Sequence, residues 1–185
     1  QSLKQLHAAL ANSPIENVIY NSSTRVYQSE EGAVNEKTSL HPQQTYAQNL
    51  LKAEKLFQTS NTPSTILRLA GLVGGNRHPI KYLKGKEGLS GGKLPVNLVH
   101  REDVIGMVQK ILEFEAWNET FLAVAAQKPP KEVYYPQIAK KFQLPPPIYT
   151  DSPAESHPEL DNQYSRAQLK YEFKFDDPFL MPVDL

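Results

Sequence analysis

Residues 18–27 read VIYNSSTRVY, an apolar run that ends in hydroxyl residues. Outward from this stretch, the first 126 residues alternate patterns typical of helices and strands. That alternation predicts an α/β fold with a mostly parallel sheet and crossover helices. The expected elements are a helix over 2–12, a strand over 17–22, a helix over about 45–58, strands over 65–69 and near 96–99, a helix over about 102–114 and a strand over 120–125.

The composition is that of a globular protein of one or two domains, with 39% apolar and 22% charged residues among 185. Lys plus Arg and Asp plus Glu number 20 each, so the formal net charge is zero and no long-range field attracts nucleic acid. No apolar run approaches the roughly 20 residues that span a bilayer. The absence of cysteine excludes disulfides and thiolate sites and is compatible with a cytoplasmic protein. We therefore expect neither a nucleic-acid nor a membrane partner.

The composition changes after residue 126, because ten of the fifteen prolines lie between residues 129 and 182. Such a shift indicates short elements joined by turns. A helix is expected there over residues 134–142, and Ser165 is the expected N-cap of a last short helix through Lys170.

Ser23 stands at the end of the first predicted strand. Hydroxyl side chains at the carboxyl end of a parallel strand lie where open α/β sheets bind ligands, which gives Ser23 a physical reason to contact a substrate. The alternative is that Ser22 and Ser23 satisfy backbone groups where the strand turns.

Four segments carry chemically useful residues at regular spacing. They are SSTRVY at 22–27, Tyr46 with Glu54 eight residues later, RLAGLVGGNR at 68–77, and an apolar strand followed by HRED at 100–103. Together they resemble extended short-chain dehydrogenases/reductases of the NAD-dependent epimerase/dehydratase family, in its atypical branch. The resemblance covers nearly the whole chain. It implies the second half of a Rossmann-like doubly wound parallel sheet, with a small C-terminal substrate lobe.

The same resemblance implies a domain organisation. Residues 1–126 correspond to a partial dinucleotide-binding domain, whose 73–95 loop contributes to the substrate lobe, and residues 127–185 to a small substrate-binding lobe. The chain has no G-x-G-x-x-G turn to hold a cofactor pyrophosphate. We therefore expect a chain that opens mid-domain and binds NAD or NADP weakly or not at all by itself. A missing N-terminal segment or another chain should lie against the Val18–Asn21 strand, which would otherwise expose unpaired backbone groups.

In the resembling family, the residue at Ser23 hydrogen-bonds the reacting oxygen of the substrate and the residue at Tyr46 is the general acid/base. A lysine one helical turn later lowers the pKa of the family's tyrosine, but position 50 is leucine here. A cation beside a phenol lowers its pKa by about 1–3 units, so the loss matters. Lys52 and Lys55 do not replace it, since they lie about 240° and about 180° around the helix from the tyrosine. Tyr46 is then a weakened acid/base, a substrate-binding phenol or an ordinary helix residue.

The resemblance also assigns a cofactor contact and a substrate contact. The backbone of Leu69, Ala70 and Gly71 would lie against the nicotinamide, and Arg77 would bind substrate. With His78 and two nearby lysines, Arg77 would present positive charge to a phosphate, a sugar-nucleotide diphosphate or a carboxylate. The alternative is a solvated basic loop.

His100 and Asp103 match the family's second signature at the start of a helix. Two ligands are too few for a metal site, so none is expected. A carboxylate in the first turn of a helix accepts exposed backbone N–H groups, and structural capping is the expected role.

Three kinds of function fit these residues. The first is an NAD(P)-dependent reductase, epimerase or dehydratase acting on a sugar nucleotide or a small hydroxy or carbonyl metabolite. The second is a non-catalytic, dinucleotide-sensing or partner-binding protein that kept the fold after losing the lysine. The third is a structural half that assembles with another polypeptide. Fold-level analogy does not decide among them.

Overall fold

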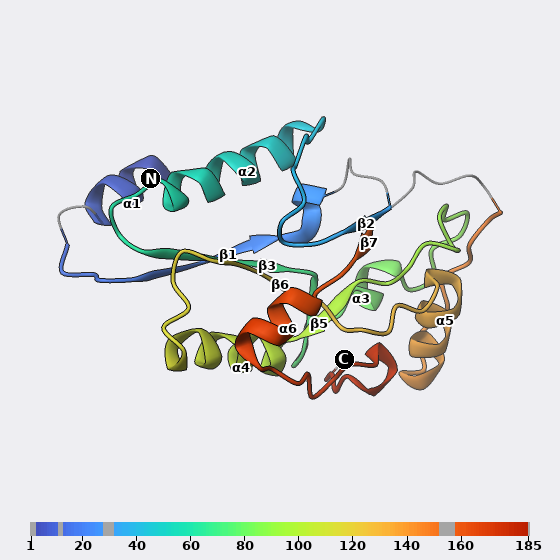
Figure 1. Cartoon of the computed structure of the whole chain (residues 1–185). Coiled ribbons are helices and arrows are strands. Elements are labelled where there is room, and N and C mark those ends of the chain that lie inside the picture. The colour runs from blue at the N-terminus through green and yellow to red at the C-terminus, as the bar shows by residue number, and fades with distance from the viewer. Residues whose placement is uncertain (1–2, 11–12, 28–31, 152–157, 185) are drawn as a thin grey trace. The chain divides into compact units, whose positions relative to one another are not determined.

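The computed structural model describes residues 3–10, 13–27, 32–151 and 158–184. The chain forms two compact units that alternate along the sequence. Figure 1 labels their helices and strands. The predicted domain boundary at residue 126 stays a prediction. Unit 1 comprises Gln1–Ala70, Ile105–Ala123 and Pro158–Glu172, and unit 2 comprises Gly71–Val104, Val124–His157 and Phe173–Leu185.

Unit 1 contains a three-stranded parallel sheet in the order β1-β3-β6. Its strands are β1 (Val18–Ser23), β3 (Ser64–Leu69) and β6 (Thr120–Ala123). Five of the six residues of the central strand β3 are buried, as expected for a parallel strand that is covered on both faces. The predicted α/β fold with a parallel sheet is confirmed.

Helices cover both faces of this sheet (Figure 1). On one face lie α1 (Leu3–Leu10) and α2 (Thr45–Gln58). On the other lie α6 (Gln163–Leu169) and residues 105–113 of α4 (Arg101–Glu113). This arrangement is that of a doubly wound sheet.

Three short elements of unit 1 were not predicted from the sequence. The 3-10 helix η1 (Thr24–Tyr27) follows β1 directly, and β2 (Ala33–Val34) pairs in parallel with β7 (Glu159–Leu160). Elements of two to four residues are too short to produce a hydrophobic period, which explains why the sequence pattern missed them.

Unit 2 contains a two-stranded parallel sheet of β4 (Gly71–Val73) and β5 (Leu98–His100). Its apolar core includes Val73 and Leu98 from these strands, together with Tyr134 and Ile138. The remaining elements of unit 2 are α3 (Ile80–Leu83), α5 (Lys131–Lys141) and η2 (Pro178–Leu180).

Most of the long predicted elements lie where the sequence placed them. α2 begins and ends at the predicted residues, and β1, β3 and β6 begin or end within two residues of their predicted bounds. The strand predicted near 96–99 is β5. The helix predicted over 2–12 is α1 over residues 3–10, and residues 2, 11 and 12 of that prediction lie outside the described residues. Within the described ranges, none of the helices has the length and apolar character needed to cross a membrane.

The prediction that Ser165 caps the last helix is wrong. α6 begins at Gln163, with Asn162 as its cap residue, and Ser165 lies buried inside the helix. The Ser165 hydroxyl accepts the N–H of Leu122 at 2.7 Å and donates to the Glu36 carboxylate. These partners lie far away in the sequence, so the local spacing that suggested a cap carries no information about them.

Candidate active site

Ser23 and Tyr46 are linked through Arg25 in unit 1. β1 ends at Ser23, and its Oγ accepts the backbone N–H of Arg25 at 3.3 Å, a local serine turn that opens η1. The guanidinium of Arg25 lies over the ring of Tyr46, with Cζ 4.8 Å from the ring centroid. Arg25 thus contacts Ser23 through its backbone and Tyr46 through its side chain, and the roles of both predicted catalytic residues stay predictions.

The face of α2 that carries Tyr46 also carries Leu50 and Glu54. Side chains four and eight residues apart lie on one face of a helix. Tyr46 and Leu50 are half-buried, and Glu54 is fully buried. An aliphatic side chain thus occupies the position one turn after the tyrosine.

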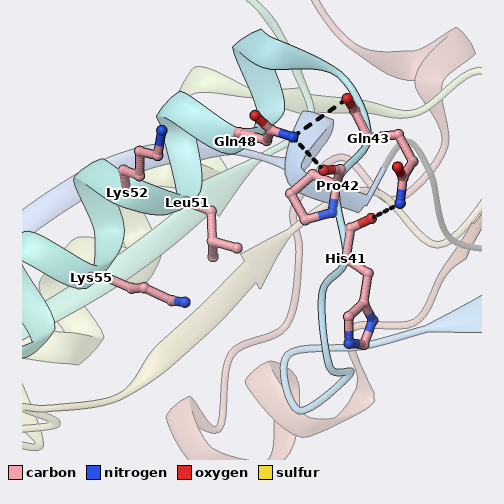
Figure 2. A pocket seen from close by; sticks show the side chains of 7 residues that line it. All are labelled: His41, Pro42, Gln43, Gln48, Leu51, Lys52 and Lys55. Atoms are coloured by element: carbon pink, nitrogen blue, oxygen red, sulfur yellow. Dashed lines mark hydrogen bonds between the residues drawn. The ribbon is translucent and has the colours of Figure 1, made fainter.

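Lys52 and Lys55 are exposed on the other side of α2 and line a pocket of about 420 Å³. Figure 2 shows Lys55 and Leu51 pointing toward His41 across this pocket, whereas the amino group of Lys52 points away. Its remaining lining residues are Pro42, Gln43 and Gln48. Neither Ser23 nor Tyr46 lines this pocket, so it is separate from the candidate catalytic cluster.

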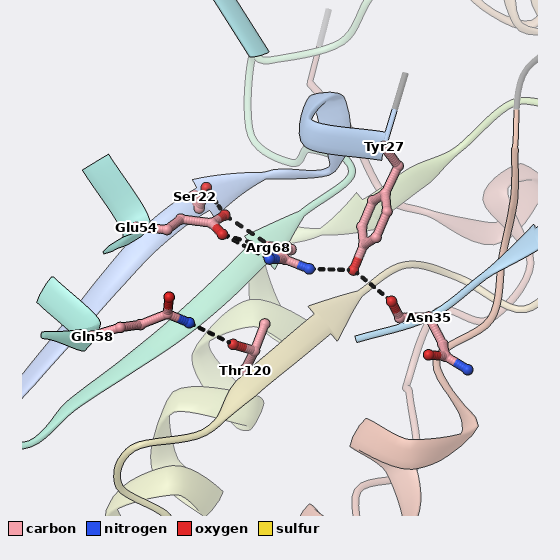
Figure 3. A network of polar contacts seen from close by, with 7 residues as sticks. All are labelled: Ser22, Tyr27, Asn35, Glu54, Gln58, Arg68 and Thr120. Atoms are coloured by element: carbon pink, nitrogen blue, oxygen red, sulfur yellow. Dashed lines mark hydrogen bonds and ion pairs between the residues drawn. The ribbon is translucent and has the colours of Figure 1, made fainter. Parts of the chain in front are cut away.

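A buried polar network lies between α2, β3 and η1 (Figure 3). Arg68 Nη2 is 2.7 Å from Glu54 Oε2, and Arg68 Nε donates to Glu54 Oε1 at 3.1 Å. The Ser22 hydroxyl donates to Glu54 Oε1 at 2.5 Å. On the other side, Arg68 Nη1 donates to the Tyr27 oxygen at 2.6 Å, and Tyr27 donates to the Asn35 carbonyl at 3.0 Å.

The charges in this network cancel. Burial alone would lower the pKa of the Arg68 guanidinium, but the hydrogen bonds to Glu54 and Tyr27 outweigh burial and raise it. Burial also raises the pKa of Tyr27, and Arg68 opposes this effect in part. Tyr27 therefore stays a neutral phenol. With its donors and acceptors matched, the network has a structural role and leaves proton transfer to other residues.

The sequence analysis did not identify Tyr27, Glu36 or Arg68 as partners in buried networks. One signal was available. Arg68 is a charged residue inside an otherwise apolar strand, and Glu54 falls on the inward face of the helix that precedes it. Buried charges are paired, so a buried Arg68 and a buried Glu54 each indicate the other as partner.

The predicted cofactor contact Leu69-Ala70-Gly71 lies where β3 ends and β4 begins. The N–H groups of Ala70 and Gly71 donate to the carbonyls of Ala123 and Asn97, both at 3.0 Å. A Cβ atom added at Gly71 would lie 2.7 Å from a methyl group of Leu98, so the glycine allows β4 to approach β5 closely. The strand packing of this chain therefore already uses both N–H groups.

Arg77 and His78 differ in their surroundings within unit 2. Arg77 is exposed, and its Nε donates to the Leu72 carbonyl at 3.1 Å. His78 is buried, and its Nδ1 accepts the N–H of Ile80 at 3.1 Å. The ring proton therefore sits on Nε2, which donates to the Tyr134 oxygen at 2.9 Å. Burial lowers the pKa of His78 to about 4, so the expectation that it presents positive charge to a ligand is wrong.

His100 and Asp103 make structural contacts in unit 2. His100 Nδ1 accepts the N–H of Glu102 at 3.3 Å at the start of α4, as a helix cap does. The Asp103 carboxylate accepts the N–H groups of Lys174 at 2.7 Å and of Phe175 at 3.2 Å, and so fastens the last segment of the chain. In the part of the chain that the structure describes, no three His, Asp or Glu side chains gather to hold a metal ion.

Comparison with known proteins assigns the family. No known family profile matches the chain. Protein YeeZ of Escherichia coli K12 is 33% identical to it over 186 residues, which cover the whole of this chain and 68% of YeeZ. The chain belongs to the family of YeeZ, and its resemblance to extended short-chain dehydrogenases/reductases is confirmed.

Several solved structures share the fold of this chain. The complex of MoeE5 with UDP-glucuronic acid and NAD is 18% identical with a TM-score of 0.77, over 93% of this chain and 64% of MoeE5. UDP-glucuronic acid 4-epimerase of Bacillus cereus, in complex with UDP-glucuronic acid and NAD, is 20% identical with a TM-score of 0.77, over 93% of this chain and 61% of the epimerase. The chain thus spans less than two thirds of the length of these two enzymes.

We expect that breaking the buried ion pair from one side will destabilise the protein strongly. Arg68→Met leaves the Glu54 carboxylate buried without its partner, which costs about 3–5 kcal/mol of unfolding free energy. The double variant Arg68→Met/Glu54→Leu removes both charges and should recover most of that loss. Urea unfolding measures each value.

The exposed pair of Lys93 and Asp151, whose charged atoms are 2.7 Å apart, supplies the control for this experiment. Lys93→Met should leave the urea midpoint unchanged, because solvent screens the pair. Equal losses in the single and double variants of the buried pair would contradict the argument.

We expect the stability of unit 2 to fall as the pH falls from 6.5 toward 4. His78 has a pKa of about 4 in the folded protein and 6.5 ordinarily, so within this range the unfolded chain binds a proton that the folded chain excludes. Stability is complete above the ordinary value and declines by about 3 kcal/mol toward the folded value. Urea unfolding at a series of pH values measures the slope. His78→Gln should flatten it, and the exposed control His41→Gln should not.

Proposed function

We propose that this chain carries the proton-transferring residues of an NAD(P)-dependent oxidoreductase of the epimerase/dehydratase kind. The proposed substrate class is a sugar nucleotide or a small metabolite with a hydroxyl or carbonyl group. One observation carries the proposal: Ser23 and Tyr46 both contact Arg25, which follows the carboxyl end of a parallel strand, where open α/β sheets bind ligands. The presence of UDP-glucuronic acid and NAD in the complexes of related enzymes supports the same substrate class.

In this proposal the two residues have distinct roles. The Tyr46 phenol exchanges a proton with the reacting oxygen of the substrate, and the Ser23 hydroxyl donates a hydrogen bond to the same oxygen. A nicotinamide, when bound, supplies the hydride chemistry. Tyr27 and Glu54 hold the elements that carry these two residues and exchange no proton with substrate, because the buried network already satisfies them.

The described residues fit one end of such a cofactor. In this proposal the nicotinamide lies against the backbone of Leu69, Ala70 and Gly71 at the end of β3, where the N–H groups of Ala70 and Gly71 already donate within the fold. Among the described residues, no strand–turn–helix of the kind that holds a pyrophosphate is present. Residues 85–91 read GKEGLSG, which has glycines at a suitable spacing, but no strand precedes them and no helix follows them directly. We therefore propose binding of NAD or NADP for the protein as a whole.

The open edge of β1 supports a further strand beside it. Among the described residues, only β3 pairs with β1. Val18 donates its N–H to the Pro63 carbonyl at 3.0 Å, and N–H groups alternate in direction along a strand, so those of Ile19 and Asn21 point toward the open edge. We propose that a preceding segment or another chain pairs there, as sheet edges require.

The rival function is a non-catalytic protein that senses a dinucleotide or binds a partner. Leu50 favours it, because no lysine stands one turn after Tyr46. The two functions differ in one measurable property, since turnover with a nicotinamide cofactor is required by the first and excluded by the second.

Tyr46→Phe is expected to abolish turnover and leave cofactor binding nearly unchanged, because the variant removes the exchangeable proton and keeps the ring. The assay uses the protein expressed from its complete open reading frame, with NAD and with UDP-glucuronic acid or UDP-glucose as probe substrates. Tyr164→Phe is the matched control, since the Tyr164 hydroxyl bonds Glu119 in the same unit. Turnover that persists in Tyr46→Phe would contradict the acid/base role and leave that tyrosine an ordinary helix residue.

The amides of Ile19 and Asn21 are expected to exchange with solvent as slowly as that of Tyr20 in the same full-length protein, because another strand accepts their N–H groups. Hydrogen exchange followed by NMR measures this, with the exposed loop residue Gly88 as the fast reference. Fast exchange at both positions would show that the edge is bare.

A further inference from the structure

We propose that Arg25 is the positioning residue for Tyr46, and that its guanidinium supplies the positive charge that an acid/base phenol requires. This inference rests on the proposed function. It assigns to η1 a charge that the sequence of α2 does not provide, since position 50 is leucine. On this inference, Leu50 does not indicate a lost active site, because the positive charge comes from another element.

The geometry places the cation against the ring. Arg25 Cζ is 4.8 Å from the Tyr46 ring centroid, within the distance of about 6 Å at which a cation interacts with an aromatic face. The guanidinium is therefore a positive charge in direct contact with the candidate phenol. The same contact restricts how the ring turns.

The backbone of Arg25 is fixed although its side chain is exposed. Its N–H donates to Ser23 Oγ, and the next two residues, Val26 and Tyr27, are completely buried. Tyr27 is in turn hydrogen-bonded to Arg68. The turn that carries Arg25 is therefore anchored on both sides, so its side chain leaves the backbone at a defined position.

Several other charged and titratable groups near α2 have partners away from Tyr46. Arg68 on β3 is neutralised by Glu54. His7 on α1 and Tyr20 on β1 lie against the ring of Phe57, near the far end of α2 from Tyr46. The remaining basic groups of α2 itself, Lys52 and Lys55, line the pocket on its outer side. Arg25 is a cation that contacts the Tyr46 ring.

The test compares four variants of the full-length protein by kcat and KM as functions of pH, in the direction in which Tyr46 accepts a proton from the substrate hydroxyl. Arg25→Gln should displace the rising limb of kcat upward by about half a pH unit and lower kcat about threefold at neutral pH, with KM nearly unchanged. Arg25→Lys, which keeps the charge, should retain most of the activity.

The decisive variant is Arg25→Gln/Leu50→Lys. A lysine at position 50 returns a cation to the Tyr46 face of the helix, so it should restore the pH profile if charge is what Arg25 supplies. Lys37→Gln is the control, because Lys37 lies 4.4 Å from the ring centroid of Tyr164, away from the candidate catalytic pair. It should leave the profile as in the wild type.

Three results would overturn the inference. A wild-type profile in Arg25→Gln, with Tyr46→Phe inactive, removes the role of Arg25 and leaves the proposed function standing. A rise in KM alone would make Arg25 a substrate-binding residue. Absence of turnover in the wild type as well removes both the proposed function and this inference.

Discussion

The ion pair between Glu54 and Arg68 fixes the geometry on which the rest of unit 1 depends. It joins α2 to the central strand β3, and through Tyr27 it extends to η1. A rotation of α2 that separated the two groups would leave a charge buried without a partner, at a cost of several kcal/mol. Because Tyr46 lies two turns before Glu54 on the same face, the pair also determines where the candidate phenol lies.

A buried ion pair is a poor choice if stability alone is required, since apolar side chains of similar volume often stabilise a core equally well. Ser22 and Tyr27 add further hydrogen bonds to the two charged groups. Few other arrangements of these side chains would keep all of these bonds. We interpret the network as a device that selects one position of α2 against the sheet. Such selection is useful at the carboxyl ends of the strands, where a displacement of about 1 Å matters for catalysis.

The sequence predicted those features that local burial controls. The bounds of α2 and the buried strand β3 follow from hydrophobic period and run length, and the motif around Ser23 and Tyr46 identified two residues that the structure links through Arg25. Features that depend on distant partners were missed. Ser165 resembles a helix cap until Glu36 is seen beside it, and His78 resembles a cation until burial against Tyr134 is known. Charge state and hydrogen-bond partner are tertiary properties, so local periodicity does not contain them.

The hydrogen bond between Ser23 and Arg25 bears on how the leucine at position 50 is interpreted. A lysine on α2 would bring its charge from the helix, independently of the strand end that carries the hydroxyl. Here the hydroxyl and the cation belong to one turn, since Ser23 Oγ accepts the N–H of Arg25. A displacement of that turn would move both groups together relative to Tyr46. Both candidate functions share the fold, so it is the chemistry of this turn, rather than the fold, on which they can be separated.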